Sequence, residues 1–278
     1  MLSYLHGYHA GNHADVLKHV VLVALLGALA AKGKPLRYVE THAGAGSFDL
    51  RAPPAQQNRE HEHGVGRLWT AHGAPAAVVR WLELVREHNA PAQRLRRYPG
   101  SPWLARRCLG ERDSIYLFEL HPAEHRLLER GCAADRRVRV LREDGLRGCV
   151  GLVPPPERRG LVLIDPSYET TDEHRLVIDA LVKAHQRFAT GVFAIWYPVI
   201  ERSRAERFVR AVRATGIEPL HRYELTVAPD TPSRGLIGSG MLLVNPPWKL
   251  GDVLAEALPW LAESLATARG GGYRIDAQ

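Results

Sequence analysis

The chain has 278 residues, of which 45% are hydrophobic and 24% are charged. These proportions are ordinary for a soluble globular protein, and the length suffices for one large α/β domain with an insertion or for two small domains. The formal net charge of +7 favours a polyanionic partner, although an Arg-rich composition alone also accounts for it.

The three cysteines, Cys108, Cys132 and Cys149, form no C-x-x-C pair. This spacing argues against a disulfide framework or a thiolate zinc site and fits a reducing cytosol. Residues 1–11 contain no apolar signal-peptide core. The longest apolar run, residues 20–31, is too short to span a bilayer and indicates a buried helix. We therefore expect a cytoplasmic protein without a membrane segment.

The N-terminal region combines an irregular arm with a long helix. Residues 1–11 are rich in Tyr, His and Gly, which predicts a loop or arm. Asn12 is a suitable N-cap for a helix over residues 13–31, and Asp15 places negative charge in its first turn. Gly33 ends the helix.

A first strand, residues 36–41, runs directly into His42-Ala43-Gly44-Ala45-Gly46. Small residues at this point let the backbone approach a ligand closely, so Gly44 and Gly46 are candidate binding residues. Position 49 is Asp, so the third glycine of a dinucleotide fingerprint is missing. No second strand follows until residues 114–120, which disfavours a nicotinamide oxidoreductase.

Residues 51–93 carry Pro-Pro, His-rich and helical patterns, and we interpret them as an inserted helical subdomain. Residues 1–50 and 94–278 then form the main domain. There, strands alternate with helices, which predicts a doubly wound, mostly parallel sheet. Besides the first, the expected strands cover residues 114–120, 138–141, 161–164, 191–197, 223–228 and 240–244, the last of the chain; helices cover 103–109, 122–130, 172–189 and 203–215, and the tail beyond Gly270 is expected to fray.

Acidic residues follow three of these strands. Glu119 ends the second and is suited to accept both hydroxyls of a ribose. Asp144 follows the third and is suited to accept an adenine amine, while Gly145 leaves room for the ring. This order matches enzymes that use S-adenosylmethionine better than it matches dehydrogenases.

The fourth strand, residues 161–164, is wholly aliphatic and ends at Asp165-Pro166-Ser167-Tyr168. An adenine exocyclic nitrogen is a poor nucleophile, and it becomes a better one when both of its N–H groups donate to acceptors. Asp165 and the carbonyl of Pro166 are the predicted acceptors, and Asp165 or water takes the proton that the product loses. Tyr168 is predicted to stack on the unstacked base.

Several motifs together resemble the bacterial 23S ribosomal RNA adenine-N6 methyltransferases of the RlmJ family. They are Y-H-A-G-N-H-A-D-V-L-K-H (8–19), T-H-A-G-A-G (41–46), Y-P-G-S-P (98–102), E-L-H-P (119–122), D-P-S-Y (165–168) and N-P-P-W-K-L (245–250). The resemblance covers nearly the whole chain. Ser167 departs from the usual D-P-P-Y, which restores an N–H and loosens the turn.

The resemblance implies a Rossmann-like class I methyltransferase that acts on adenine 2030 of free 23S RNA or an assembly intermediate. It implies cofactor contacts at His19, His42, Ser101, Glu119, Asp144, Gly145 and Asp165, with Lys18 as a further contributor, and it places Tyr4 and His6 at the mouth of the active site. We expect a monomer that uses no metal ion.

Other interpretations remain open from the sequence. Within enzymes, the alternatives are DNA adenine or protein glutamine methylation; outside them, an inactive RNA-binding module. The Asn245 to Trp248 segment is a second N-P-P-W candidate, but it follows a late strand and is expected to be a structural turn. Two groups of arginines are suited to bind phosphates or to form a solvated face: Arg94, Arg96 and Arg97, and Arg204, Arg207 and Arg210.

Overall fold

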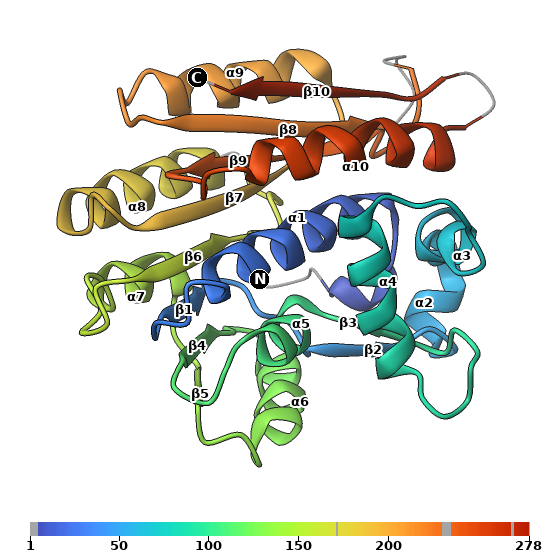
Figure 1. Cartoon of the computed structure of the whole chain (residues 1–278), viewed down its shortest axis with the longest axis horizontal. Coiled ribbons are helices and arrows are strands. Elements are labelled where there is room, and N and C mark those ends of the chain that lie inside the picture. The colour runs from blue at the N-terminus through green and yellow to red at the C-terminus, as the bar shows by residue number, and fades with distance from the viewer. Residues whose placement is uncertain (1–4, 171, 230–234, 268–269, 278) are drawn as a thin grey trace.

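The computed structural model describes residues 5–170, 172–229, 235–267 and 270–277. Its main feature is an eight-stranded sheet in the order β10-β8-β9-β7-β6-β1-β4-β5 (Figure 1). The five strands from β5 to β7 pair in parallel, and β9, β8 and β10 pair antiparallel. The strands are β1 (Arg37–Glu40), β4 (Ser114–Phe118), β5 (Val138–Leu141), β6 (Gly160–Ile164), β7 (Val192–Val199), β8 (Leu220–Thr226), β9 (Gly238–Val244) and β10 (Gly272–Ala277).

Strand β6 lies in the middle of the parallel part, between β1 and β7. All of its residues are buried, because both faces of the sheet are covered there. This explains the unbroken aliphatic run, which has no polar face to turn towards water. The strand ends at Ile164, and Asp165-Pro166 follows at the carboxyl edge of the sheet. The predicted strand and its end are confirmed.

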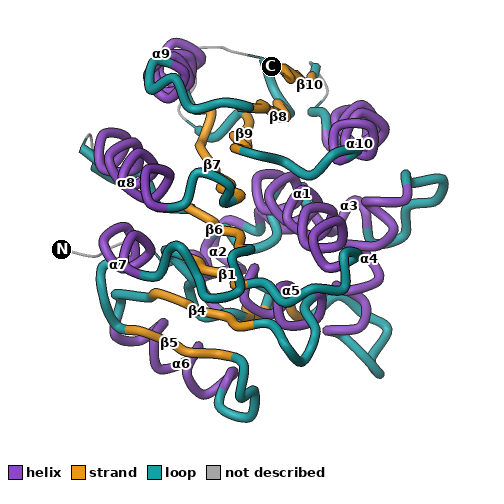
Figure 2. Tube along the Cα trace, turned by 60° about the vertical axis from the view of Figure 1, so that its left-hand side comes forward, coloured by secondary structure: helices purple, strands orange, loops and turns teal. Residues whose placement is uncertain are grey.

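Helices cover the sheet in two layers (Figure 2). The core of one layer contains side chains of α1, α4, α5, α6 and α10, and the core of the other contains side chains of α7, α8 and α9. The Rossmann-like α/β fold is therefore confirmed. These helices are α1 (His13–Ala30), α4 (Ala76–His88), α5 (Ser101–Cys108), α6 (Pro122–Cys132), α7 (Gly145–Gly151), α8 (Glu173–Arg187), α9 (Arg202–Arg213) and α10 (Leu250–Leu265).

Helix α1 is the core helix of its layer. The side chain of Asn12 accepts hydrogen bonds from the N–H groups of Ala14 and Asp15, so the predicted N-cap is present. By length and composition the helix is apolar enough to cross a membrane, but Val16, Leu17 and most of its other side chains are buried inside the protein. Its uniform apolarity is therefore that of a helix surrounded by other elements.

The predicted insertion is helical, and it shares the main core. Trp81 and Leu82 of α4 belong to the same hydrophobic cluster as α1, so α4 is not packed on a core of its own. A two-stranded antiparallel ribbon that was not predicted brackets the insertion; its short strands, β2 and β3, have little room for an alternating pattern. The division into subdomains remains a prediction. The further elements here are β2 (Ser47–Asp49), α2 (Pro53–Asn58), η2 (Glu60–His63), α3 (Val65–Leu68) and β3 (Arg97–Pro99).

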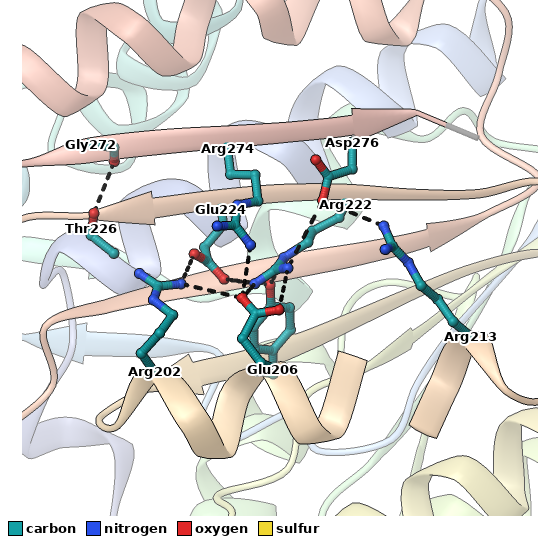
Figure 3. A network of polar contacts seen from close by, with 10 residues as sticks. Arg202, Glu206, Arg213, Arg222, Glu224, Thr226, Gly272, Arg274 and Asp276 are labelled. Atoms are coloured by element: carbon teal, nitrogen blue, oxygen red, sulfur yellow. Dashed lines mark hydrogen bonds and ion pairs between the residues drawn. The ribbon is translucent and has the colours of Figure 1, made fainter. Parts of the chain in front are cut away.

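The C-terminal region differs from the prediction. Residues 240–244 were expected to be the last strand and the tail to fray, but β10 pairs with β8 at the edge of the sheet. Helices α7 and α10 were not predicted either. The signal was weak because β10 is an edge strand whose residues are exposed or half-buried. Figure 3 shows the polar network of arginines and carboxylates that joins β8, β10 and α9, with Glu206 and Glu224 among Arg202, Arg222 and Arg274.

Candidate active site

A cleft of about 760 Å³ opens at the carboxyl edge of the parallel strands. It is lined by the residues that follow β1, β4, β5 and β6 and by one face of α1. Parallel strands bring their carboxyl ends to one edge, which explains why residues far apart in sequence meet there. The predicted residues that line the cleft are His6, Lys18, His19, His42, Gly44, Ser101, Glu119, Asp144, Gly145, Asp165, Pro166 and Tyr168.

A chain of charged contacts links α1 to the end of β6. The Nζ of Lys18 lies 2.7 Å from Oδ2 of Asp165 and 2.9 Å from Oδ1 of Asp15. The other oxygen of Asp15 contacts Nε2 of His6 and accepts the N–H of Gly11, both at 2.8 Å. Asp15 and Lys18 are almost completely buried. The end of the N-terminal arm, the first helix and the central strand are thus joined in one network.

The charges in this network stabilise one another. Burial acts to raise the pKa of Asp15, but the neighbouring His6 and Lys18 outweigh it and hold that pKa well below its usual value. Burial acts to lower the pKa of Lys18, and the carboxylates of Asp15 and Asp165 raise it above its ordinary value instead. Lys18 is therefore a cation between two acids across the physiological pH range.

Two histidines present neutral imidazoles to the cleft. Nδ1 of His19 hydrogen-bonds the hydroxyl of Tyr98 at 2.8 Å, and its buried Nε2 has no partner within the described residues. Burial lowers the pKa of His19 to about 3 and that of His42 to about 4. Nδ1 of His42 lies 2.7 Å from Oγ1 of Thr41. An uncharged, buried nitrogen that faces a cleft is suited to hydrogen-bond a polar ligand.

The two acids that follow β4 and β5 are held by backbone donors. Glu119 accepts the N–H of Gly44 at 2.8 Å through one oxygen and the N–H of His121 at 2.6 Å through the other. Asp144 caps α7 by accepting the N–H groups of Leu146 and Arg147. These contacts fix the direction in which each carboxylate faces the cleft.

The three predicted glycines, Gly44, Gly46 and Gly145, have different structural roles. A Cβ on Gly145 would lie 1.9 Å from the carbonyl oxygen of Thr41, so this glycine lets α7 approach the end of β1. Gly145 was predicted to leave space for an adenine ring, but the backbone of Thr41 already requires a glycine at this position. Gly46 is buried, with φ of 76°, and its carbonyl accepts the N–H of Gly100 at 3.0 Å. It shapes the turn behind the cleft wall, whereas Gly44 lines the cleft itself.

Glu40 is a site residue that sequence reasoning missed. It is fully buried at the end of β1 and accepts hydrogen bonds from the hydroxyls of Tyr38 and Ser101. Burial raises its pKa to about 8, against the opposing effect of these two hydroxyls. A single acid inside an otherwise buried strand was the available signal. Because Ser101 lines the cleft, Glu40 fixes the hydroxyl of a cleft residue.

Tyr168 is the last residue of the Asp165 to Tyr168 segment, and it is buried. Its φ of 54° is in the left-handed region, which is strained for a residue of this size. The hydroxyl donates to the carbonyl of Trp196 at 2.7 Å, and the ring packs against His174, Trp196 and Phe208. The tyrosine is thus held rigidly, although Ser167 stands where a second proline is usual.

Comparison with known proteins identifies the family. The protein-family model described as "Ribosomal RNA large subunit methyltransferase D, RlmJ" matches residues 33–277. The chain belongs to the RlmJ family.

Its RlmJ relatives match over almost their full length. Ribosomal RNA large subunit methyltransferase J of Escherichia coli is 43% identical over 271 residues, which cover 98% of this chain and 96% of that protein. The Haemophilus influenzae protein of the same name is 41% identical over 276 residues, covering 99% and 98%. A crystal structure of a Legionella pneumophila protein superimposes with a TM-score of 0.90 at 34% identity, covering 97% and 98%. The predictions of a methyltransferase and of its family are confirmed.

The structure of this RlmJ protein also bears on Tyr4, on the N-P-P-W segment and on possible metal ligands. Tyr4 lies outside the described residues. Asn245 follows β9, which runs antiparallel to β7, so the N-P-P-W segment lies at the edge of the sheet opposite the cleft. The Asn245 side chain there donates to the carbonyls of Ala189 and Gly191, as expected of a structural turn. Within the described ranges, no group of three or more His, Cys, Asp or Glu side chains is placed to hold a metal ion.

Proposed function

We propose that this chain transfers a methyl group from S-adenosylmethionine to N6 of an adenine in 23S ribosomal RNA. The observation that supports this most directly is the Asp165 carboxylate, held by Lys18 where the central strand opens into the cleft. By family resemblance, the target is adenine 2030. Such a substrate places the enzyme in the bacterial cytoplasm, where we expect it to act as a monomer.

The residues of the cleft fit this cofactor. The unpartnered Nε2 of His19 is the clearest sign, because a buried nitrogen that faces a cleft needs a polar group from a ligand. Glu119 is proposed to accept ribose hydroxyls, and Asp144 is proposed to accept an adenine amine. When bound, the cofactor supplies a methyl group that its sulfonium already activates. The residues proposed to hold it are Lys18, His19, His42, Gly44, Ser101, Glu119, Asp144, Gly145 and Asp165.

Asp165 is the proposed acceptor for the substrate amine. Lys18 occupies its Oδ2, and no hydrogen bond to its Oδ1 is found in the described part of the chain. Oδ1 is then available for one N–H of the target adenine, and the carbonyl of Pro166 for the other. Hydrogen bonds from both N–H groups to these acceptors make the nitrogen more nucleophilic, and Asp165 or water takes up the one proton that the methylated amine releases. The remaining work is positioning, which a rigid, buried network performs well.

Aromatic and N-terminal groups are proposed to hold the base. Tyr168 lines the cleft three residues beyond Asp165, and its ring is the proposed stacking surface for an unstacked adenine. His6 lies at the cleft and contacts Asp15, so it connects the base site to the lysine. Tyr4 is proposed to act beside His6.

The test is methyl transfer from labelled S-adenosylmethionine to naked 23S RNA, a ribosome-assembly intermediate, duplex DNA and protein in separate reactions. We expect label in RNA, released by nuclease digestion as N6-methyladenosine and identified by mass spectrometry. Label only in DNA or in protein glutamine would replace the RNA assignment with one of those activities. RNA binding without any transfer would indicate an inactive binding module.

Asp165→Asn tests the acceptor within the same assay. The substitution keeps the shape of the side chain and removes its charge, so we expect methyl transfer to fall by about 100-fold or more. Isothermal titration with S-adenosylhomocysteine supplies a second measurement that does not depend on turnover. An unchanged transfer rate in this variant would show that Asp165 is not the acceptor.

A further inference from the structure

A groove of about 440 Å³ lies between α8 and α9, outside the cleft described above. The two helices are neighbours in the layer that also contains α7 (Figure 2). Ile178, Phe208 and Ala211 supply its apolar lining. Arg175, Arg204 and Arg207 supply its positive charge. We refer to this feature as the α8–α9 groove.

Helix α9 has two differently used faces. On one face, Arg202, Glu206 and Arg213 are tied into the network with β8 and β10 (Figure 3). On the other face, Arg204 and Arg207 line the groove, and neither forms an ion pair within the described residues. The network therefore anchors the helix while it leaves these two guanidinium groups free for a partner.

The charge of the groove comes mainly from α9. Arg175 of α8 is already near two carboxylates, with Nη1 3.3 Å from Asp179 and Nη2 3.8 Å from Asp172. It therefore contributes little net charge. Arg204 and Arg207 remain as two cations beside an apolar surface, with no carboxylate partner among the residues that the structure describes. A guanidinium pair next to an apolar groove wall matches one nucleotide of a single strand, with its phosphate on the arginines and its base on the apolar side chains.

The groove adjoins the proposed base site. His174 lines the groove, and its ring centroid lies 4.7 Å from that of Tyr168 and 4.9 Å from that of Phe208. On the same helix, Glu173 and Leu176 line the cleft, so α8 borders both spaces. A strand whose adenine rests against Tyr168 thus meets the groove as its next surface.

We propose that the α8–α9 groove binds a nucleotide that flanks the target adenine in the same RNA strand, with Arg204 and Arg207 on its phosphate. The inference rests on the proposed methylation of RNA and adds to it a site for substrate recognition. It gives a role to Arg204 and Arg207, which form no ion pair within the described residues and lie beside Phe208, whose ring contacts Tyr168.

The test compares Arg204→Ala/Arg207→Ala with the wild type on a single-stranded RNA fragment that contains the target. We expect KM for RNA to rise about tenfold or more, with kcat at saturating RNA and the Kd for S-adenosylhomocysteine unchanged. The slope of log KM against log salt should become shallower by about 0.7 for each lost phosphate contact. Arg210→Ala is the matched control, because Arg210 lies on the same helix, is exposed and does not line the groove. Ile178→Ala probes the base-contacting surface separately, and melting temperatures establish that all variants are folded.

The decisive experiment measures KM with shortened RNA fragments. Shortening the RNA on the side that reaches the groove should raise KM for the wild type and have no effect on the double variant. An equal KM and salt slope in the wild type and the double variant, on RNA that the wild type methylates, would overturn the groove proposal alone. A wild type that methylates no RNA would overturn the proposed function, and the groove proposal with it.

Discussion

Nζ of Lys18 lies 2.7 Å from Oδ2 of Asp165, although 147 positions separate the two residues in the chain. The contact joins the first helix to the end of the central strand. Asp15 holds the same ammonium group from the other side at 2.9 Å. The first helix therefore does more than fill the core, because it supplies the counter-charge of the proposed catalytic acid.

Replacing Lys18 with Met should weaken both stability and catalysis. The substitution leaves the buried Asp15 and the partly exposed Asp165 without the cation between them, and breaking a buried pair in this way costs about 3–5 kcal/mol. Denaturant unfolding measures the loss, and single-turnover methylation is expected to slow by at least about tenfold. Lys183→Met, at an exposed position of α8, should change stability by less than about 0.5 kcal/mol. Similar unfolding free energies for the two variants would contradict the importance of this contact.

Gly145→Ala should destabilise the protein because of a backbone clash. The added Cβ would lie 1.9 Å from the carbonyl oxygen of Thr41, so α7 has to move away from β1. Gly151→Ala, in the same helix, adds a methyl group with no neighbour within 4 Å and should be neutral or stabilising by up to about 1 kcal/mol. Thermal melting and S-adenosylhomocysteine titration of the pair measure the difference. Equal melting temperatures would show that the helix adapts without loss.

The sequence was sufficient to predict the parallel strands and the acids that follow them. Asp165 comes directly after an apolar run and Asp144 three residues after the end of β5, and parallel strands place such residues at one edge of a sheet. The prediction therefore needed only local patterns and a rule of topology. The motif resemblance added His19 and Ser101, which no local pattern singles out as ligands.

Local sequence patterns do not predict contacts between side chains that are far apart in the chain. From the sequence, Asp15 is only a favourable acid in the first turn of a helix, because nothing local indicates that it holds Lys18. Glu40 has the pattern of an ordinary strand residue, since its burial depends on elements that come later in the chain. β10 is not predictable because it is exposed rather than buried. An exposed edge strand has no apolar periodicity, and β10 forms by pairing with β8.

The network around Arg222 should be a major source of stability for the C-terminal strands. Arg222 is 1% exposed and contacts Glu224 at 2.6 Å and Glu206 at 2.7 Å. Arg222→Met leaves Glu224 buried with one cation fewer, so we expect a loss of about 3 kcal/mol in unfolding free energy. Arg210→Met, at an exposed position of α9, should have almost no effect. If denaturant curves for both variants overlay that of the wild type, the network contributes no net stability.

Tyr168 combines a structural hydroxyl with a proposed stacking ring, and two substitutions separate them. Tyr168→Phe removes the bond to the carbonyl of Trp196, which should reduce stability by about 1 kcal/mol and leave methyl transfer almost intact. Tyr168→Ala also removes the ring and should reduce kcat/KM for RNA by about tenfold or more. Equal activity of the Phe and Ala variants would argue against base stacking on this ring.

Glu40 should make the protein less stable as the pH rises. Its pKa is about 8 in the folded protein, against 4.5 as the ordinary value, because burial disfavours the charged form. The folded state therefore binds more protons than the unfolded state between these two values. The stabilising contribution of protonated Glu40 is complete below about pH 4.5 and is lost as the pH rises through about 8.

Glu40→Gln isolates this effect, because the amide resembles the protonated acid and does not titrate. Its hydrogen bonds with Ser101 and Tyr38 can be kept, so we expect nearly equal melting temperatures for the variant and the wild type near pH 5. Towards pH 8 the wild type should melt progressively lower than the variant, by about 5 °C or more. Other titrating groups, Asp15 included, are common to both proteins and cancel in the difference. A difference that stays constant from pH 5 to pH 8 would mean that Glu40 does not take up its proton on folding.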